Sequence, residues 1–244
     1  MNKFWKFKNV KNKGVNESEL YLTEYIAEES WFMDDVTPEK FKAELSQCSG
    51  DLTVYINSPG GDCFAASEIY TALMEYDGKI TVKIESLAAS AASVVAMAGD
   101  SVEMSPTSLM MIHNPSVYLY GEVADLEQGI EFLNEVKESI VNAYQLKTGL
   151  SRAKISKLMD TETWLSAKTA QDLGFADKML YEDCKKKLET NDSGGFESFN
   201  KQASVTNTIA AMRKKLKPIP QNTDDGIKIS DAMSRLKLAG GTFK

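Results

Sequence analysis

The sequence predicts an α/β fold with a mainly parallel sheet. Segments rich in β-branched and aromatic residues alternate with segments whose apolar residues recur at helical spacing. This order is typical of parallel strands joined by crossover helices. With 244 residues, 43% of them hydrophobic, the chain can bury a full core.

The first half contains two strand-helix steps. A strand is expected over 19–27, and Thr37-Pro38-Glu39 then supplies an N-cap, a proline at the first helical position and an acidic first turn for a helix over 37–47. The next strand, 52–57, is ended by the sharp turn Ser58-Pro59-Gly60-Gly61. A helix over 63–76 and a strand over 79–85 complete a unit of strand, turn, helix and strand.

The second half repeats the alternation. A small-residue helix is expected from about 90 to 98, followed by strands at 101–104 and 109–113. Residues 122–147 form the longest predicted helix and carry one apolar stripe, which fits either a subunit interface or cover for the chain's own sheet. A last helix begins near Ser166, and the segment FADKML resembles a terminal strand.

Composition divides the chain into three parts. Residues 1–18 contain five lysines and are expected to be a flexible, solvated segment. Residues 19–183 form the predicted α/β domain. Residues 184–244 are mostly polar, with two weakly amphipathic stretches, so they are expected to form a disordered or partly helical tail, free or docked on a partner.

Charge and cysteine content exclude several classes of protein. The net charge of −7 argues against binding nucleic acid or an anionic membrane, since both need a cationic face. The sequence has neither a run of about 18 apolar residues nor a signal-peptide pattern, which favours a cytoplasmic location. Cys48, Cys63 and Cys184 lie too far apart for a CxxC motif, so they are expected to be reduced thiols.

Three features could support acyl-transfer chemistry. His113 is the single histidine, so any serine-histidine mechanism must use it, although a histidine at the end of an apolar strand is more often structural. Ser90 follows a strand and opens a helix, a position with free amides, although it could also be only a cap. The pair Gly60-Gly61 could bring backbone amides near a bound carbonyl, or could be only a turn.

In combination these features resemble one family. The blocks INSPGG (56–61), AASAAS (88–93), MIHNP (111–115) and ETWLSAKTAQDLGFAD (162–177) resemble, in order and spacing, the signature blocks of the Clp protease proteolytic subunit. The resemblance covers roughly residues 20–181. The forms SPGGD, LAASAAS and ETW are most similar to the subgroup encoded by tailed bacteriophages and prophages, which is associated with capsid maturation.

The resemblance implies a set of site residues and no cofactor or metal. Ser90 falls at the family's nucleophile and His113 at its base, while Gly61 and Ala91 fall where backbone amides form the oxyanion hole. The family's aspartate position falls on Glu162, and Asp160 is the substitute. A glutamate can accept the imidazole N–H bond, but its extra methylene changes its reach.

The resemblance also implies a fold, partners and two possible uses. The fold would be the crotonase-like spiral of ββα units, with the helix at 122–147 joining stacked homo-oligomeric rings. The substrate would be a polypeptide: scaffold or capsid protein inside a prohead, or protein delivered by an ATPase unfoldase in general turnover. A crotonase-fold acyl-CoA enzyme and a non-enzymatic ring scaffold are the alternatives from other classes.

Overall fold

The computed structural model describes residues 3–12, 15–26 and 38–182. The strands are β1 (Trp5–Asn12), β2 (Val15–Ile26), β3 (Leu52–Gly61), β4 (Ile80–Ala89), β5 (Ser101–Met104), β6 (Leu109–Ile112), β7 (Thr163–Ser166) and β8 (Lys178–Met179). The helices are α1 (Pro38–Leu45), α2 (Cys63–Met74), α3 (Ala91–Ala96), α4 (Val123–Thr148), α5 (Arg152–Asp160) and α6 (Ala167–Asp172). None of these helices is both long and apolar enough to cross a membrane.

The chain divides into two compact units. The first comprises residues 1–116 and 130–182 and contains all the strands above. The second comprises residues 117–129 and 183–244, of which the structure describes 117–129. In this described part, the backbone N–H of Glu122 donates to the Asp125 carboxylate (3.0 Å) at the start of α4.

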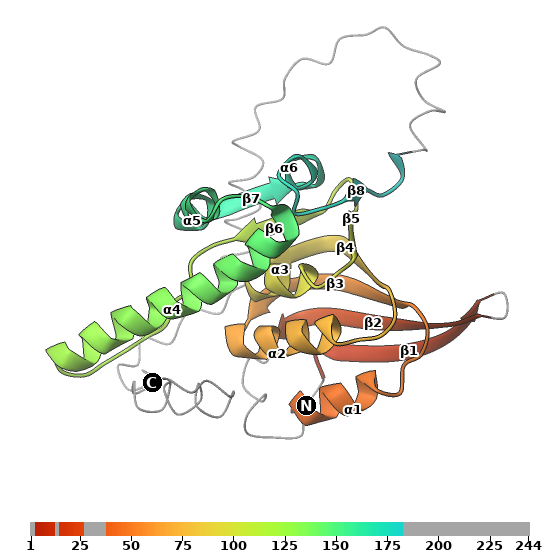
Figure 1. Ribbon diagram of the computed structural model, residues 1–244, viewed down its shortest axis with the longest axis horizontal. Coiled ribbons are helices and arrows are strands. Elements are labelled where there is room, and N and C mark those ends of the chain that lie inside the picture. Colours follow the sequence, from red (N-terminus) through yellow and green to blue (C-terminus); the bar gives the residue numbers. More distant parts are fainter. Residues whose placement is uncertain (1–2, 13–14, 27–37, 183–244) are drawn as a thin grey trace, which may run out of the picture. The chain divides into compact units, whose positions relative to one another are not determined.

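The eight strands form one mixed sheet. Its main path is β1-β2-β3-β4-β5-β8, and β6 pairs with both β4 and β7 (Figure 1). Only β1–β2 and β6–β7 are antiparallel. Because the first half of β4 pairs with β5 and its last residues pair with β6, β4 is the strand at which the sheet branches.

The predicted α/β class is confirmed, and most predicted elements are present. The strand expected at 52–57 is β3, and the strand expected at 79–85 is β4. The long helix expected at 122–147 is α4, and the helix expected near Ser166 is α6, whose N-cap is Ser166 itself. The sequence analysis did not identify α5 or β7. The expected tail, residues 184–244, lies outside the described residues.

The expectation of a flexible start is wrong for Trp5–Asn12. These residues form β1, which pairs antiparallel with β2 along its whole length. The lysines dominated the pattern, but the bulky apolar residues alternate with them: Trp5 is buried and Phe7 packs on the core, whereas Lys6 and Lys8 lie on the exposed face. Alternation of this kind is the signature of a half-buried strand.

Small residues let α3 lie close to the sheet. All six α3 residues are buried, and the helix packs against β3, β4 and α2 (Figure 1). Gly60 in β3 has φ +98°, and a Cβ there would lie only 2.9 Å from the Ala91 nitrogen. The glycine therefore permits the close approach of β3 to the start of α3.

Within the first unit, α4 presents both a buried and an exposed face. Its buried residues are Val136, Ile140, Val141, Ala143 and Tyr144. Ile130 and Leu146 are 61% and 77% exposed. The apolar stripe predicted for this helix is therefore only partly used to cover the chain's own core.

Candidate active site

Strand register places Ser90 beside His113. Strands β4 and β6 are parallel, and Ala89 is paired with Met111. Each strand ends within a residue of that pair, so the residues that follow the two strands emerge at the same edge of the sheet. The backbone N–H of Ser90 donates to the Met111 carbonyl (2.9 Å), which extends the ladder to the serine itself.

Ser90 and His113 are in direct contact. The distance from Ser90 Oγ to His113 Nε2 is 2.7 Å. Ser90 has φ 53° and ψ −126°, a backbone conformation that is unusual for a residue other than glycine and costs about 1–3 kcal/mol. Such a turn directs the hydroxyl away from both flanking elements, as a nucleophile at the end of a strand requires.

The environment of His113 suits a base. Burial lowers the pKa of His113 below 6.5, and the charge of Glu162 raises it in part. The imidazole is therefore largely neutral at pH 7. With the ring proton on Nδ1, Nε2 is free to accept the proton of the Ser90 hydroxyl.

The two candidate carboxylates have different surroundings. The negative charge of Glu162 favours the protonated form of His113 and so raises its pKa. The Oε1 atom of Glu162 accepts a hydrogen bond from Trp164 Nε1 (3.3 Å). Asp160 Oδ1 accepts from Asn114 Nδ2 (2.9 Å) and forms an ion pair with Lys137 Nζ (2.5 Å).

These contacts separate the roles open to the two carboxylates. The hydrogen bonds from Lys137 and Asn114 lower the pKa of Asp160, so this carboxylate is ionised. Its Oδ1 atom already accepts from these two side chains. No hydrogen bond within residues 3–12, 15–26 and 38–182 joins either carboxylate to His113. The geometry thus brings Ser90 and His113 together, whereas Glu162 interacts with the imidazole through its charge.

A small pocket surrounds the serine-histidine pair. Its volume is about 110 Å³, and the predicted oxyanion residues Gly61 and Ala91 line it together with Ser90 and His113. Its remaining lining residues are Cys63, Val94, Pro115, Ser116, Ile140 and Tyr144. Two backbone segments with amide donors therefore border the same space as the hydroxyl and the imidazole.

The turn that carries Gly61 is held on both sides. The N–H of Asp62 donates to the Ile26 carbonyl (2.9 Å), and the Asp62 carboxylate caps α2 by accepting from the N–H groups of Phe64 and Ala65. Gly61 itself has φ +145°, and a Cβ there would lie 2.2 Å from the Ile26 oxygen. Only glycine fits this position, and the hydrogen bonds of Asp62 hold the turn in place.

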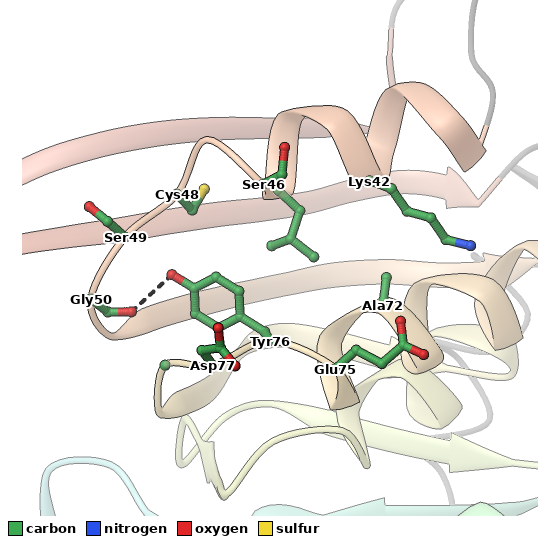
Figure 2. A pocket seen from close by; sticks show the side chains of 11 residues that line it. Lys42, Ser46, Cys48, Ser49, Gly50, Ala72, Glu75, Tyr76 and Asp77 are labelled. Carbon is green, nitrogen blue, oxygen red and sulfur yellow. Dashed lines mark hydrogen bonds between the residues drawn. The ribbon is translucent and has the colours of Figure 1, made fainter.

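A larger cavity, of about 540 Å³, lies between α1 and α2 and lacks a serine-histidine pair (Figure 2). The Tyr76 hydroxyl donates there to the Gly50 carbonyl (2.9 Å). Burial raises the pKa of Cys48, which lines this cavity, and raises the pKa of Cys63 to about 12, with the charge of Asp62 adding to the effect. Both thiols are thus protonated and poorly nucleophilic at neutral pH.

Sequence reasoning missed two polar residues next to the nucleophile. Ser93 Oγ donates to the Ser90 carbonyl (2.6 Å) and lies 2.8 Å from the Tyr144 hydroxyl. Ser93 belongs to the AASAAS block, but Tyr144 lies 51 residues further along the chain. The one signal in the sequence for Tyr144 is its position next to the apolar stripe of the long helix, which suggests that its side chain faces the core.

Fold and site together define the class of protein. A serine hydroxyl, a neutral imidazole within hydrogen-bond reach and backbone amides around one pocket are the parts of a serine hydrolase. A strand-turn-helix element carries the serine, as in other hydrolases that attack carbonyl groups.

Comparison with known proteins specifies the family. Residues 6–183 match the family described as Clp protease, and the chain belongs to this family of serine-type endopeptidases. It is 28% identical over 176 residues to ATP-dependent Clp protease proteolytic subunit 1 of Chlamydia abortus, which covers 70% of this chain and 91% of that protein. It is 29% identical over 155 residues to the ATP-dependent Clp protease proteolytic subunit of Bacteroides fragilis, covering 61% of this chain and 75% of that protein.

Proposed function

We propose that the chain hydrolyses peptide bonds with Ser90 as nucleophile and His113 as general base. The observation that carries the proposal is the 2.7 Å contact between Ser90 Oγ and His113 Nε2 beside the amides of Gly61 and Ala91. Glu162 is the carboxylate that stabilises the imidazolium, because its charge acts on His113 and the Asp160 carboxylate is already bound to Lys137 and Asn114.

The reaction proceeds in two acyl transfers. Ser90 Oγ attacks the peptide carbonyl carbon while His113 Nε2 takes the hydroxyl proton, and the N–H groups of Gly61 and Ala91 stabilise the oxyanion. His113 then protonates the departing amine, which leaves an ester on Ser90. Water attacks this ester with His113 again as base, so that the acid product is released and the serine regains its proton.

We also infer that the protein acts as a homo-oligomeric ring. Ile130 and Leu146 expose apolar surface on α4, and an exposed apolar stripe on a long helix favours contact with another subunit. Enclosing the pocket in stacked rings would keep folded proteins away from a peptidase of broad specificity. The substrate is therefore an extended polypeptide.

Two uses of this activity are proposed, each supported by a different observation. The relatives named above are proteolytic subunits of ATP-dependent Clp proteases, which favours general protein turnover with an ATPase unfoldase. The forms SPGGD, LAASAAS and ETW favour cleavage of scaffold or capsid protein during prohead maturation. Both uses place the protein in the bacterial cytoplasm, and the second places it within proheads.

The activity is tested with Ser90→Ala and His113→Ala proteins. Wild type should cleave an unfolded polypeptide and react with a fluorophosphonate, and mass spectrometry should locate the label on Ser90. Each variant should lose about 10³-fold or more in kcat without loss of fold, because the two residues act as a unit. A Ser67→Ala protein is the control, since that hydroxyl donates to the Cys63 carbonyl on an exposed face of α2. Unchanged cleavage by Ser90→Ala would reject the assignment.

A second experiment separates the two uses. The wild-type and Ser90→Ala proteins are each incubated with an ATPase unfoldase plus a folded substrate, and with the scaffold protein of a candidate prohead. Serine-dependent cleavage only with the ATPase present supports turnover, and direct cleavage of the scaffold supports maturation. Hydrolysis of an acyl-CoA thioester in place of peptide would instead favour the acyl-CoA alternative.

A further inference from the structure

A chain of two hydrogen bonds links α4 to the carbonyl of the nucleophile. Ser93 Oγ lies 2.6 Å from the Ser90 carbonyl oxygen and 2.8 Å from the Tyr144 hydroxyl. The Ser90 carbonyl can only accept, so the single hydroxyl proton of Ser93 goes to it. Tyr144 therefore donates to Ser93, and the order is Tyr144 to Ser93 to Ser90.

Both side chains of this relay are shielded from water. Ser93 is fully buried and Tyr144 is 1% exposed. Burial raises the pKa of Tyr144 well above its usual value, so its hydroxyl keeps the proton that it donates. In a buried site each of these hydrogen bonds is strong, and the loss of one leaves a polar group unpaired.

The relay orients the peptide group between Ser90 and Ala91. In a trans peptide the C=O and the N–H point in opposite directions. The Ser90 C=O is held inward by Ser93 through both the hydroxyl (2.6 Å) and the backbone N–H (2.9 Å). The Ala91 N–H at the other end of the same peptide must then point away from Ser93, and Ala91 lines the pocket with Ser90 and His113.

We propose that Ser93 and Tyr144 are positioning residues, which aim the Ala91 N–H at the oxyanion by anchoring the Ser90 carbonyl. The proposal rests on the proposed peptidase function. It gives a reason for Ser93 in α3, which is otherwise made of alanine and valine, and for the Tyr144 hydroxyl that reaches it from α4, where alanine and phenylalanine would fill almost the same space. The strained φ of Ser90 gives this second anchor a purpose, since a peptide held by the Ser93 N–H alone could rotate more easily to relieve the strain.

The test compares Ser93→Ala, Tyr144→Phe and the double variant in the full-length protein. Ser93→Ala should lower kcat about 10-fold, less than the 10²-fold or more expected when an oxyanion donor is removed outright. Tyr144→Phe should lower kcat by about 3-fold, because Ser93 retains its bond to Ser90. KM should change by less than about 2-fold in both, because the interaction is made in the transition state.

Two further measurements separate positioning from a merely structural role. A peptide aldehyde forms a hemiacetal with Ser90 whose oxygen takes the place of the oxyanion, so its affinity should fall by the same factor as kcat. The double variant should unfold within about 3 °C of wild type, since replacing both buried partners by apolar groups is nearly neutral. Its kcat should equal that of Ser93→Ala, because Tyr144 acts only through Ser93.

Matched controls come from the larger cavity (Figure 2). Ser46 Oγ donates to the Ala43 carbonyl three residues earlier (2.8 Å), as Ser93 does to Ser90, and the Tyr76 hydroxyl donates to the Gly50 carbonyl (2.9 Å). Ser46→Ala and Tyr76→Phe should leave kcat and aldehyde affinity unchanged.

Three results would overturn the proposal. They are an unchanged kcat in Ser93→Ala, a kcat loss without a matching loss of aldehyde affinity, and additive effects in the double variant. Ser90→Ala is measured alongside. If Ser90→Ala still cleaves peptide, the proposed function itself fails; if it is inactive while Ser93→Ala is as fast as wild type, only the positioning role fails.

Discussion

Replacement of Gly60 by alanine tests how closely β3 must approach the nucleophile. A Cβ at this position would lie 2.6 Å from the Ala89 oxygen, 2.8 Å from Ser90 Cβ and 2.9 Å from the Ala91 nitrogen. Two of these three neighbours are backbone atoms, which cannot move aside without displacing the turn. The substitution should therefore damage both stability and catalysis.

The expected size follows from two contributions. Placing a side chain at φ +98° costs about 1–2 kcal/mol. Forcing a methyl group into filled space adds about 1–3 kcal/mol. The free energy of unfolding should thus fall by roughly 2–5 kcal/mol. In a protein of this size, each kcal/mol lost lowers Tm by about 2–4 °C. A displacement of Ser90 by about 1 Å should cost roughly 100-fold in kcat.

Gly149→Ala is the matched control. Gly149 also has a positive φ (+69°), but no atom lies within 4 Å of the added Cβ, so only the conformational cost of about 1–2 kcal/mol applies. Thermal unfolding at one protein concentration and peptide cleavage are measured for both variants. Equal losses of Tm in the two proteins, together with full activity of Gly60→Ala, would refute the close-approach argument.

Further predictions concern His113 and the two carboxylates. Because burial lowers the pKa of His113, kcat/KM should rise with pH to a plateau, with a midpoint below 6.5. A midpoint above 7 in the pH profile would contradict this. Glu162→Gln should lower that midpoint further, since the charge of Glu162 raises the pKa, and should reduce kcat roughly 10- to 100-fold by removing support for the imidazolium. Asp160→Asn should change kcat by less than about fivefold, because its ion pair with Lys137 is exposed. A larger effect of Asp160→Asn than of Glu162→Gln in steady-state kinetics would reverse the assignment.

Folding stability should depend on the same histidine. His113 is neutral in the folded protein at a pH where an unfolded chain would still bind a proton. The unfolded state thus binds more protons between the two pKa values, so stability is lost as pH falls through 6.5 toward the folded pKa. His113→Gln should remove this contribution in urea titrations at pH 5 and pH 8.

Local pattern predicted the elements whose signals are strong. Alternation and β-branched residues mark β3 and β4, and the apolar stripe of α4 recurs over 26 residues. Local preferences this strong decide the secondary structure whatever the packing partners are. Strand β1 was missed because Lys6 and Lys8 lie on its exposed face, and α5 and β7 were missed because each is short and marked by few apolar residues. Weak local preferences of this kind are decided by packing partners elsewhere in the chain.

The sequence by itself singled out Ser90 and His113 as the candidate pair, because the chain contains one histidine and both residues lie in blocks that resemble those of the Clp protease family. Only the tertiary structure decided how that pair is supported. The parallel register of β4 and β6 brings Ser90 to His113, Asp160 is bound by Lys137, and Tyr144 reaches Ser93 across 51 residues. These contacts depend on directions and distances between elements, which a linear pattern does not encode.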